Sequence, residues 1–335
     1  MRIKGVMAAS VLLAASAATR VSADTLQLAW PLACDIGRTC WVQNYVDHDA
    51  GPGVRDYACG TLTYNTHDGT DIRLRSIAAQ RSGVDVLAAA DGTVRRTRDG
   101  VADRVMRDET ASSPEGRECG NGLVIDHGDG WETQYCHMAQ GSIRVSPGAR
   151  VKAGQPLGRV GLSGFTVFPH LHLTVRHRGV TVDPFAFGAT PGSCSGGSPL
   201  WVPRLREALA YSERSVLNVG FASAPVTMMA IEMEEVGRET LVADAPALVA
   251  YVQAIGLKVG DVQHLIVRAP DGTPIVDHAA QPLDRNKAQT LLFAGRKRPP
   301  TGWPPGSYAA SFAVLRDGKV VLEHSFATTI GAVTR

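Results

Sequence analysis

Turn-forming dipeptides recur through this chain of 335 residues and limit what it can fold into. Asp-Gly and Pro-Gly pairs recur from residue 62 onward, a pattern typical of short strands joined by turns. Apolar segments lie between them at residues 84–89, 91–94, 123–125 and 143–145. The pattern therefore predicts a mainly β protein, built as an antiparallel sheet or flattened barrel, with no room for a long helix.

The first 23 residues have the composition of a secretory signal peptide. Arg2 and Lys4 precede an apolar run over residues 6–18 that is too short to span a membrane, and small residues allow cleavage after Ala23. We therefore expect a periplasmic or secreted protein with no lipid anchor and no later membrane span.

Cleavage would also change the charge of the chain. Losing the three cations of the signal segment, Arg2, Lys4 and Arg20, takes the formal charge from +2 to −1. This near-neutral balance, without a cluster of basic residues interleaved with aromatics, gives no electrostatic case for binding nucleic acid or an anionic membrane.

Six cysteines follow the cleavage point, at positions 34, 40, 59, 119, 136 and 194. An even number in an exported chain indicates three disulfides, and the absence of a Cys-x-x-Cys pair makes a metal cluster the weaker alternative. The turn at residues 127–130 joins two strands that bring Cys119 and Cys136 into near register, which predicts a bond between them. The pairing of Cys34, Cys40, Cys59 and Cys194 stays open, although a bond from Cys194 to one of the other three would tie the linker to the preceding domain.

Composition divides the chain at a Gly-, Ser- and Pro-rich stretch over residues 188–199. We expect a signal peptide at 1–23, a cystine-stapled lead-in at 24–60, a β-rich domain at 61–188, a linker at 189–215 and a second β domain at 216–335. The last region has apolar segments at residues 247–257, 263–268, 309–315 and 319–326. Turns separate them, which predicts a small immunoglobulin-like β-sandwich that binds the cell wall or a protein partner.

Two histidine stretches stand out in the first β-rich domain, at residues 66–71 and 169–172. Alternation along a strand places His170 and His172 on the same face. His67 and Asp71 lie four apart around a glycine and can reach one ion. Three protein ligands leave one coordination position open, as a catalytic zinc requires, whereas a structural zinc usually has four.

A third element, residues 135–138, adds His137, and together the stretches predict a catalytic zinc site rather than chance pairs. The pattern resembles the lysostaphin-type (LytM, M23) zinc endopeptidases of bacterial cell walls, in the family's order over about residues 60 to 188. The matching segments are 67–71, 120–130, 133–138, 169–172 and 182–184. The resemblance implies zinc on His67, Asp71 and His172, with His137 and His170 acting on the bound water and the scissile peptide.

Two positions depart from the family pattern. Phe168 stands where glycine is usual before the Pro-His-Leu-His run, and Thr174 stands where a glutamate commonly follows it. Neither change removes a ligand, so both concern substrate fit more than catalysis.

The resemblance implies an exported zinc metalloendopeptidase that hydrolyses peptide bonds in peptidoglycan cross-links or stem peptides. No His-Glu-x-x-His helix supplies a glutamate base, so His137 and His170 are the candidates for proton transfer and oxyanion stabilisation. Two other functions stay open: a non-catalytic activator of another wall hydrolase, and a protease of exported proteins.

Other polar groups near these motifs receive weaker interpretations. Asp126 and Tyr135 are candidates for orienting the ligands, whereas His127 is expected at a hairpin tip without a catalytic role. The long polar segment over residues 99–118 is either a wall of the cleft or a solvated loop.

Overall fold

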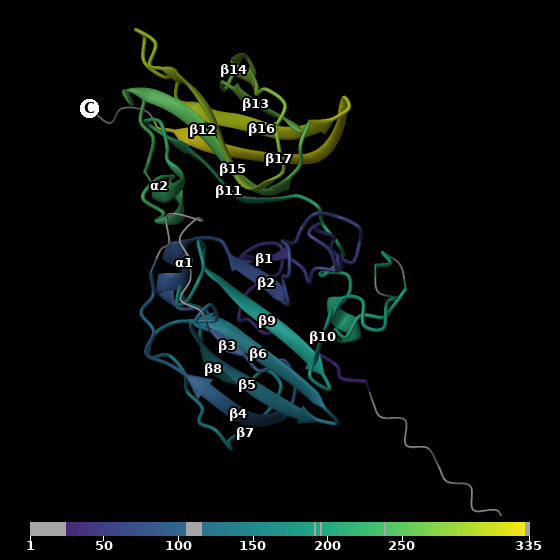
Figure 1. Ribbon diagram of the computed structural model, residues 1–335. Helices are drawn as coiled ribbons and strands as arrows, with labels where there is room; N and C mark the ends of the chain where they lie inside the picture. Colours follow the sequence, from purple (N-terminus) through teal and green to yellow (C-terminus); the bar gives the residue numbers. More distant parts are fainter. Residues whose placement is uncertain (1–24, 105–115, 191, 195, 238, 332–335) are drawn as a thin grey trace, which may run out of the picture.

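The structure is a computed structural model that describes residues 25–104, 116–190, 192–194, 196–237 and 239–331. Its strands form two β units, which lie one above the other in Figure 1. Helical segments in the described part are short: α1 (Ile77–Ser82), α2 (Met228–Glu232) and a 3₁₀ turn at Pro203–Leu205. The predicted mainly β class with antiparallel sheets is confirmed. The predicted signal peptide lies outside the described residues.

An eight-stranded antiparallel sheet forms the first unit. Its order is β1 (Cys40–Asn44), β2 (Thr70–Leu74), β9 (His170–His177), β6 (Trp131–Met138), β5 (Asn121–Gly128), β4 (Gly92–Arg98) and β7 (Arg150–Val151), with β10 (Val180–Val182) also paired to β9. Because β1 and β7 are the two ends of this path, the sheet is open rather than a closed barrel.

Alternation along the central strands gives this sheet one core face and one polar face. Leu123, Tyr135 and Leu173 point into the core, where β3 (Asp85–Leu87) and β8 (Pro156–Arg159) form a second layer through Val86 and Leu157. The predicted strand at residues 143–145 was wrong, since these residues have no strand assignment and run between turns.

The described part of the predicted lead-in, residues 25–60, packs as part of this first unit. Leu28, Trp30 and Leu32 are buried in its core, and β1 forms the edge strand beside β2. The six cysteines form the bonds Cys34–Cys40, Cys59–Cys194 and Cys119–Cys136. The predicted 119–136 bond is therefore confirmed, and Cys59 is the partner of Cys194 that the sequence left open.

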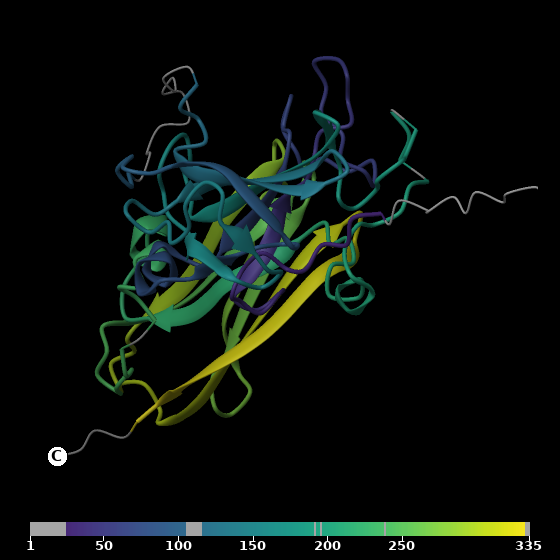
Figure 2. The same cartoon turned by 90° about the horizontal axis from the view of Figure 1, so that it is seen from below.

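The second unit has two sheets that share one core. One contains β11 (Ser215–Ala222), β12 (Ala247–Leu257) and β15 (Lys287–Lys297); the other has the order β14 (Pro274–Ala279), β13 (Val262–Arg268), β16 (Gly306–Arg316) and β17 (Lys319–Ile330). In Figure 2 the yellow pair β16 and β17 forms a long twisted ribbon. The more specific label, immunoglobulin-like, stays a prediction, as do the domain boundaries.

Strand β12 belongs to the second unit, and one of its faces also contacts the first unit. Leu248, Val252 and their alternating neighbours face the sandwich core, whereas Ile255 packs with Leu217 and with Trp41 of the first unit. A strand buried on both faces has a nearly continuous apolar sequence, which is the pattern of residues 247–257.

In the part of the chain that the structure describes, no helix is long and apolar enough to cross a membrane.

Candidate active site

Strands β2 and β9 bring the predicted metal ligands together. Asp71 lies directly opposite His172 in the antiparallel register, and His67 comes from the loop that enters β2. Asp71 Oδ1 lies 3.2 Å from His67 Nε2 and 2.9 Å from His172 Nδ1, and the two nitrogens are 3.2 Å apart. Ligand atoms about 2.0–2.1 Å from a tetrahedral zinc lie about 3.3 Å from one another. The three side chains therefore form a buried group that could hold a metal ion.

Each of these three side chains also has a hydrogen-bond partner outside the group. The Nδ1 atom of His67 donates to the Tyr45 carbonyl at 2.6 Å, and Asp71 Oδ2 accepts from the Asn44 amide at 2.9 Å. The outer nitrogen of His172, Nε2, lies 3.1 Å from the Thr174 hydroxyl and 3.2 Å from Asp68 Oδ1. Such contacts fix which ligand atom faces the centre.

Gly69 permits this arrangement because there is no space for a side chain. A Cβ atom at residue 69 would lie 2.6 Å from His172 Nε2, which is closer than real contacts allow. The glycine between His67 and Asp71 is therefore required by the close approach of the His172 ring rather than by turn geometry alone.

The charges of the ligands depend on one another. Burial raises the pKa of Asp71, but His67 and His170 lower it, and the pKa lies well below its usual range. Burial lowers the pKa of His172, but hydrogen bonds to Asp68 and Asp71 raise it to about 9. A metal ion on Nδ1 must displace a proton from this ring, so binding should weaken in acid.

His170 and His137 lie at the side of the ligand group. His170 Nε2 is 3.4 Å from Asp71 Oδ1, and its Nδ1 donates to the Phe168 carbonyl at 3.0 Å. The His137 ring centre is 4.6 Å from that of His170 and 6.0 Å from that of His172. Its Nδ1 donates to the Ser163 carbonyl at 2.9 Å, and burial, together with His170 and His172, holds its pKa well below the ordinary value.

A local irregularity turns His137 toward this group. Asn121 pairs with Met138 and Leu123 pairs with Tyr135, so β6 contains one extra residue between these pairs. His137 has a φ of 60°, in the left-handed region that few non-glycine residues adopt. Regular alternation would place His137 and Cys136 on opposite faces of the sheet. The bulge turns His137 to the same face as Cys136.

A family model described as Peptidase family M23 matches residues 65–184, which include His67, Asp71, His137, His170 and His172. This segment belongs to peptidase family M23. The resemblance found in the sequence is thereby confirmed, and the M23 domain covers the central strands of the first unit.

Curated relatives that match part of this chain include a cell division protein and a peptidoglycan endopeptidase. The chain is 29% identical over 164 residues to the cell division protein DipM of Caulobacter vibrioides, which covers 47% of this chain and 20% of DipM. It is 32% identical over 117 residues to the peptidoglycan DD-endopeptidase ShyA of Vibrio cholerae, covering 35% of this chain and 22% of ShyA. The chain therefore spans about a fifth of the length of these relatives.

Solved structures that are similar to part of this chain include a zinc-containing peptidase from Vibrio cholerae. It is 27% identical to this chain, with a TM-score of 0.28, and the match covers 42% of this chain and 39% of that one.

A cavity of about 370 Å³ opens over the candidate ligands of the M23 domain. Besides His67, His137 and His172, it is lined by Tyr64, Glu118 and Phe165. The Tyr64 ring packs on His67 with the ring centres 4.3 Å apart. The sequence interpretation missed Tyr64 and Phe165, because a single aromatic residue in a turn-rich loop gives no periodic signal.

The two departures from the family pattern have local explanations. Thr174 places its hydroxyl on His172 Nε2. Phe168 covers the guanidinium of Arg73, whose central carbon lies 4.7 Å from the ring centre. Arg73 is fully buried and ion-paired with Glu232 of the second unit, so the aromatic residue at 168 accompanies a contact between the units.

Two weaker sequence interpretations were wrong. The Tyr135 hydroxyl lies in the core, where it accepts from the Ala89 amide at 2.8 Å, and does not reach the ligands. Asp126 accepts from the Gly128 amide at the hairpin. Most of the 99–118 segment, residues 105–115, lies outside the described residues, and of the remainder Glu118 lines the cleft.

Proposed function

We propose that this chain is an exported zinc endopeptidase that hydrolyses peptide bonds of peptidoglycan. The observation that carries the proposal is the convergence of three ligand atoms, from His67, Asp71 and His172, with two further histidines beside them. Membership of residues 65–184 in peptidase family M23 supports the reaction class. The name of ShyA, a peptidoglycan DD-endopeptidase, supports the substrate class.

The donor set fits zinc. Two imidazole nitrogens and one carboxylate oxygen are ligands that zinc accepts, and His67 Nε2, His172 Nδ1 and Asp71 Oδ1 would hold it. When bound, zinc supplies a Lewis acid that polarises a carbonyl and lowers the pKa of water.

His137 and His170 have matching hydrogen-bond patterns that suit proton transfer. Each uses Nδ1 to donate to a backbone carbonyl, of Ser163 and Phe168 respectively, which leaves Nε2 without the proton in the neutral ring. An Nε2 lone pair can take the proton from the attacking water, and the protonated ring can return it to the leaving amine. The second ring can donate to the oxygen that becomes negative.

Digestion of purified peptidoglycan sacculi tests this function. Mature zinc-loaded protein should release soluble peptides with new amino termini, identified by mass spectrometry, and a chelator should stop the release until zinc is restored. A His278→Ala variant, altered at an exposed histidine of the sandwich, serves as a control and should keep full activity.

The alternatives predict other results. Absence of stoichiometric zinc, together with no peptide release, would contradict the enzyme and favour the activator. Cleavage of exported proteins but not of sacculi would contradict the substrate class.

A further inference from the structure

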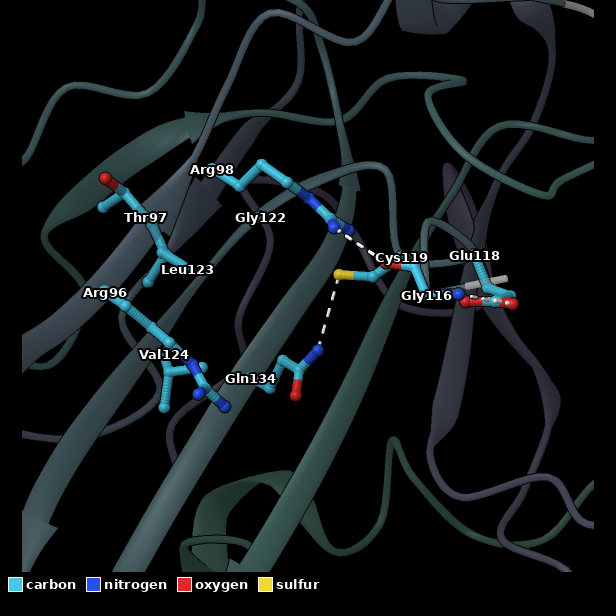
Figure 3. A pocket seen from close by; sticks show the side chains of 10 residues that line it. All are labelled: Arg96, Thr97, Arg98, Gly116, Glu118, Cys119, Gly122, Leu123, Val124 and Gln134. Carbon is cyan, nitrogen blue, oxygen red and sulfur yellow. Dashed lines mark hydrogen bonds between the residues drawn. The ribbon is translucent and has the colours of Figure 1, made fainter. Parts of the chain in front are cut away.

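A second cavity, of about 460 Å³, adjoins the cleft of the M23 domain. It shares three lining residues with that cleft, Glu118, Cys119 and Gln134, so the two cavities adjoin, and together they are called the groove. Figure 3 shows its other side chains: Arg96 and Arg98 extend from β4 over the strand that carries Leu123 and Val124. Arg96 and Arg98 lie outside the segments that match the family pattern.

A β-bulge places both arginines on the groove face. Val94 pairs with Ile125 and points into the core, but Arg96 pairs with Val124, so Arg95 is an extra residue in β4. Without the bulge, alternation would direct Arg96 to the core face together with Val94. The bulge reverses the alternation, so that Arg96 and Arg98 both face the cavity.

The charges at this end of the groove suit an anion. Arg96 is exposed and forms no ion pair or hydrogen bond within the described part of the chain. Arg98 donates to the carbonyls of Gly120 at 2.6 Å and Gly116 at 3.0 Å, which fixes its guanidinium and leaves other N–H groups free. One carboxylate, Glu118, also lines the cavity and accepts from the Gly116 amide at 3.2 Å. Guanidinium groups at the edge of a partly apolar floor match a carboxylate in shape and charge.

The distance from the candidate zinc site fits a peptide that crosses the strands. The groove runs from His172 on β9 over β6 and β5 to Arg96 on β4, which is three strand spacings. Neighbouring strands lie about 4.8 Å apart, so the distance is about 14 Å, or about four residues of extended peptide.

We infer that Arg96 and Arg98 form a subsite for a substrate carboxylate about four residues from the scissile bond. This inference rests on the proposed function and specifies its substrate class as an acidic peptide that lies across β9, β6, β5 and β4. Arg96 supplies the free guanidinium, and Arg98 supplies a second one at a fixed position.

The test compares Arg96→Gln with two matched variants. Arg96→Lys keeps the charge, and Arg95→Gln removes a neighbouring cation that is ion-paired with Glu132 at 2.6 Å rather than facing the cavity. The probes are sacculi and a purified disaccharide tetrapeptide from peptidoglycan, each in native form and with its carboxylates converted into amides. Hydrolysis gives KM and kcat, calorimetry gives the Kd of the fragment, and elemental analysis gives the zinc content.

Arg96→Gln should raise KM and Kd for the native probes about tenfold, with kcat within about twofold of wild type and zinc content unchanged. The amidated probes should bind wild type and Arg96→Gln equally. Arg96→Lys should recover much of the loss, and Arg95→Gln should behave as wild type.

An equal loss on native and amidated probes, or no loss on either, would overturn the subsite. These outcomes are separable from failure of the proposed function. If wild type cleaves sacculi and Arg96→Gln changes neither KM nor Kd, the function stands and the subsite is wrong. If no variant cleaves sacculi, but Arg96→Gln selectively weakens binding of the native fragment, the subsite stands and the function is wrong.

Discussion

One carboxylate oxygen, Asp71 Oδ1, is in contact with three histidines. His67 and His172 lie 3.2 Å and 2.9 Å from it, and His170 lies 3.4 Å away. The rings of His170 and His172 share a face of β9 but differ in their other contacts. The second nitrogen of His172 contacts Thr174 and Asp68. The second nitrogen of His170 instead donates to the Phe168 carbonyl, and the His170 ring packs beside the His137 ring.

This difference predicts separate effects of substitution. His172→Ala should lower zinc affinity by far more than the 10- to 100-fold typical of an outer contact, because it removes one of three ligands. His170→Ala and His137→Ala should keep zinc and lower kcat by about 10² to 10⁴, the size of a lost general acid or base. Elemental analysis and steady-state kinetics measure both. The assignment would be reversed if His170→Ala lost the metal and His172→Ala retained it.

His48 gives a prediction about pH. A hydrogen bond of 2.8 Å to Asp183 raises the pKa of His48, against the opposing effect of burial. A group whose pKa is raised by folding stabilises the protein fully below its ordinary pKa of about 6.5, and this stabilisation is lost as the pH rises through the folded value. Urea unfolding should therefore show His48→Asn less stable than wild type at about pH 6, with a smaller difference at about pH 9. A difference that grows with pH would contradict the assigned ion pair.

At the level of elements, two bulges direct His137 and Arg96 onto the polar face of one sheet. One lies at His137 in β6 and the other at Arg95 in β4. The Cys119–Cys136 disulfide lies between them on the same face, beneath the Gln134 amide, which is 3.4 Å from one sulfur and 3.2 Å from the other. The groove floor therefore includes a covalent link between β6, which contains one of the bulges, and the segment that precedes β5.

The three disulfides should differ in their effect on stability. They join residues 6, 17 and 135 positions apart. Closing a longer loop removes more entropy from the unfolded chain, which gives about 2, 3 and 5 kcal/mol respectively. Double Cys→Ala variants of each pair, unfolded in urea, should show this order, with the 34–40 pair as the control. Peptide mapping without reduction should find the same three bonds, and another pairing would contradict the registers described above.

At the level of the whole molecule, a buried polar network joins the two units. Arg73 is fully buried and donates to Gln43 at 3.0 Å, to Gln289 at 3.0 Å and to Glu232. Glu232 also accepts from Gln253 at 2.8 Å. Because Gln289, Glu232 and Gln253 belong to the second unit, the sandwich satisfies a charge located two residues after Asp71 in β2.

Removing the Glu232 carboxylate should therefore destabilise the chain strongly. Glu232→Ala leaves Arg73 buried without its counter-charge, and breaking such a pair costs about 3–5 kcal/mol. Asp284→Ala is the matched control, because its partner Lys287 lies 3.2 Å away at an exposed site where pairs contribute about 0–1 kcal/mol. Urea unfolding measures both variants. Equal small losses would show that Arg73 does not require the sandwich.

The sequence by itself determined the features that depend on neighbouring residues. Short strands between turns, the shared face of His170 and His172, and the 119–136 bond follow from alternation and hairpin register. Tertiary structure decided what depends on contacts between distant segments. It placed His137 and Arg96 by bulges, paired Cys59 with Cys194, and surrounded Arg73 with partners from the second unit. A bulge moves every following side chain to the opposite face, and a buried charge needs partners that only folding brings within reach, so neither can be deduced from local spacing.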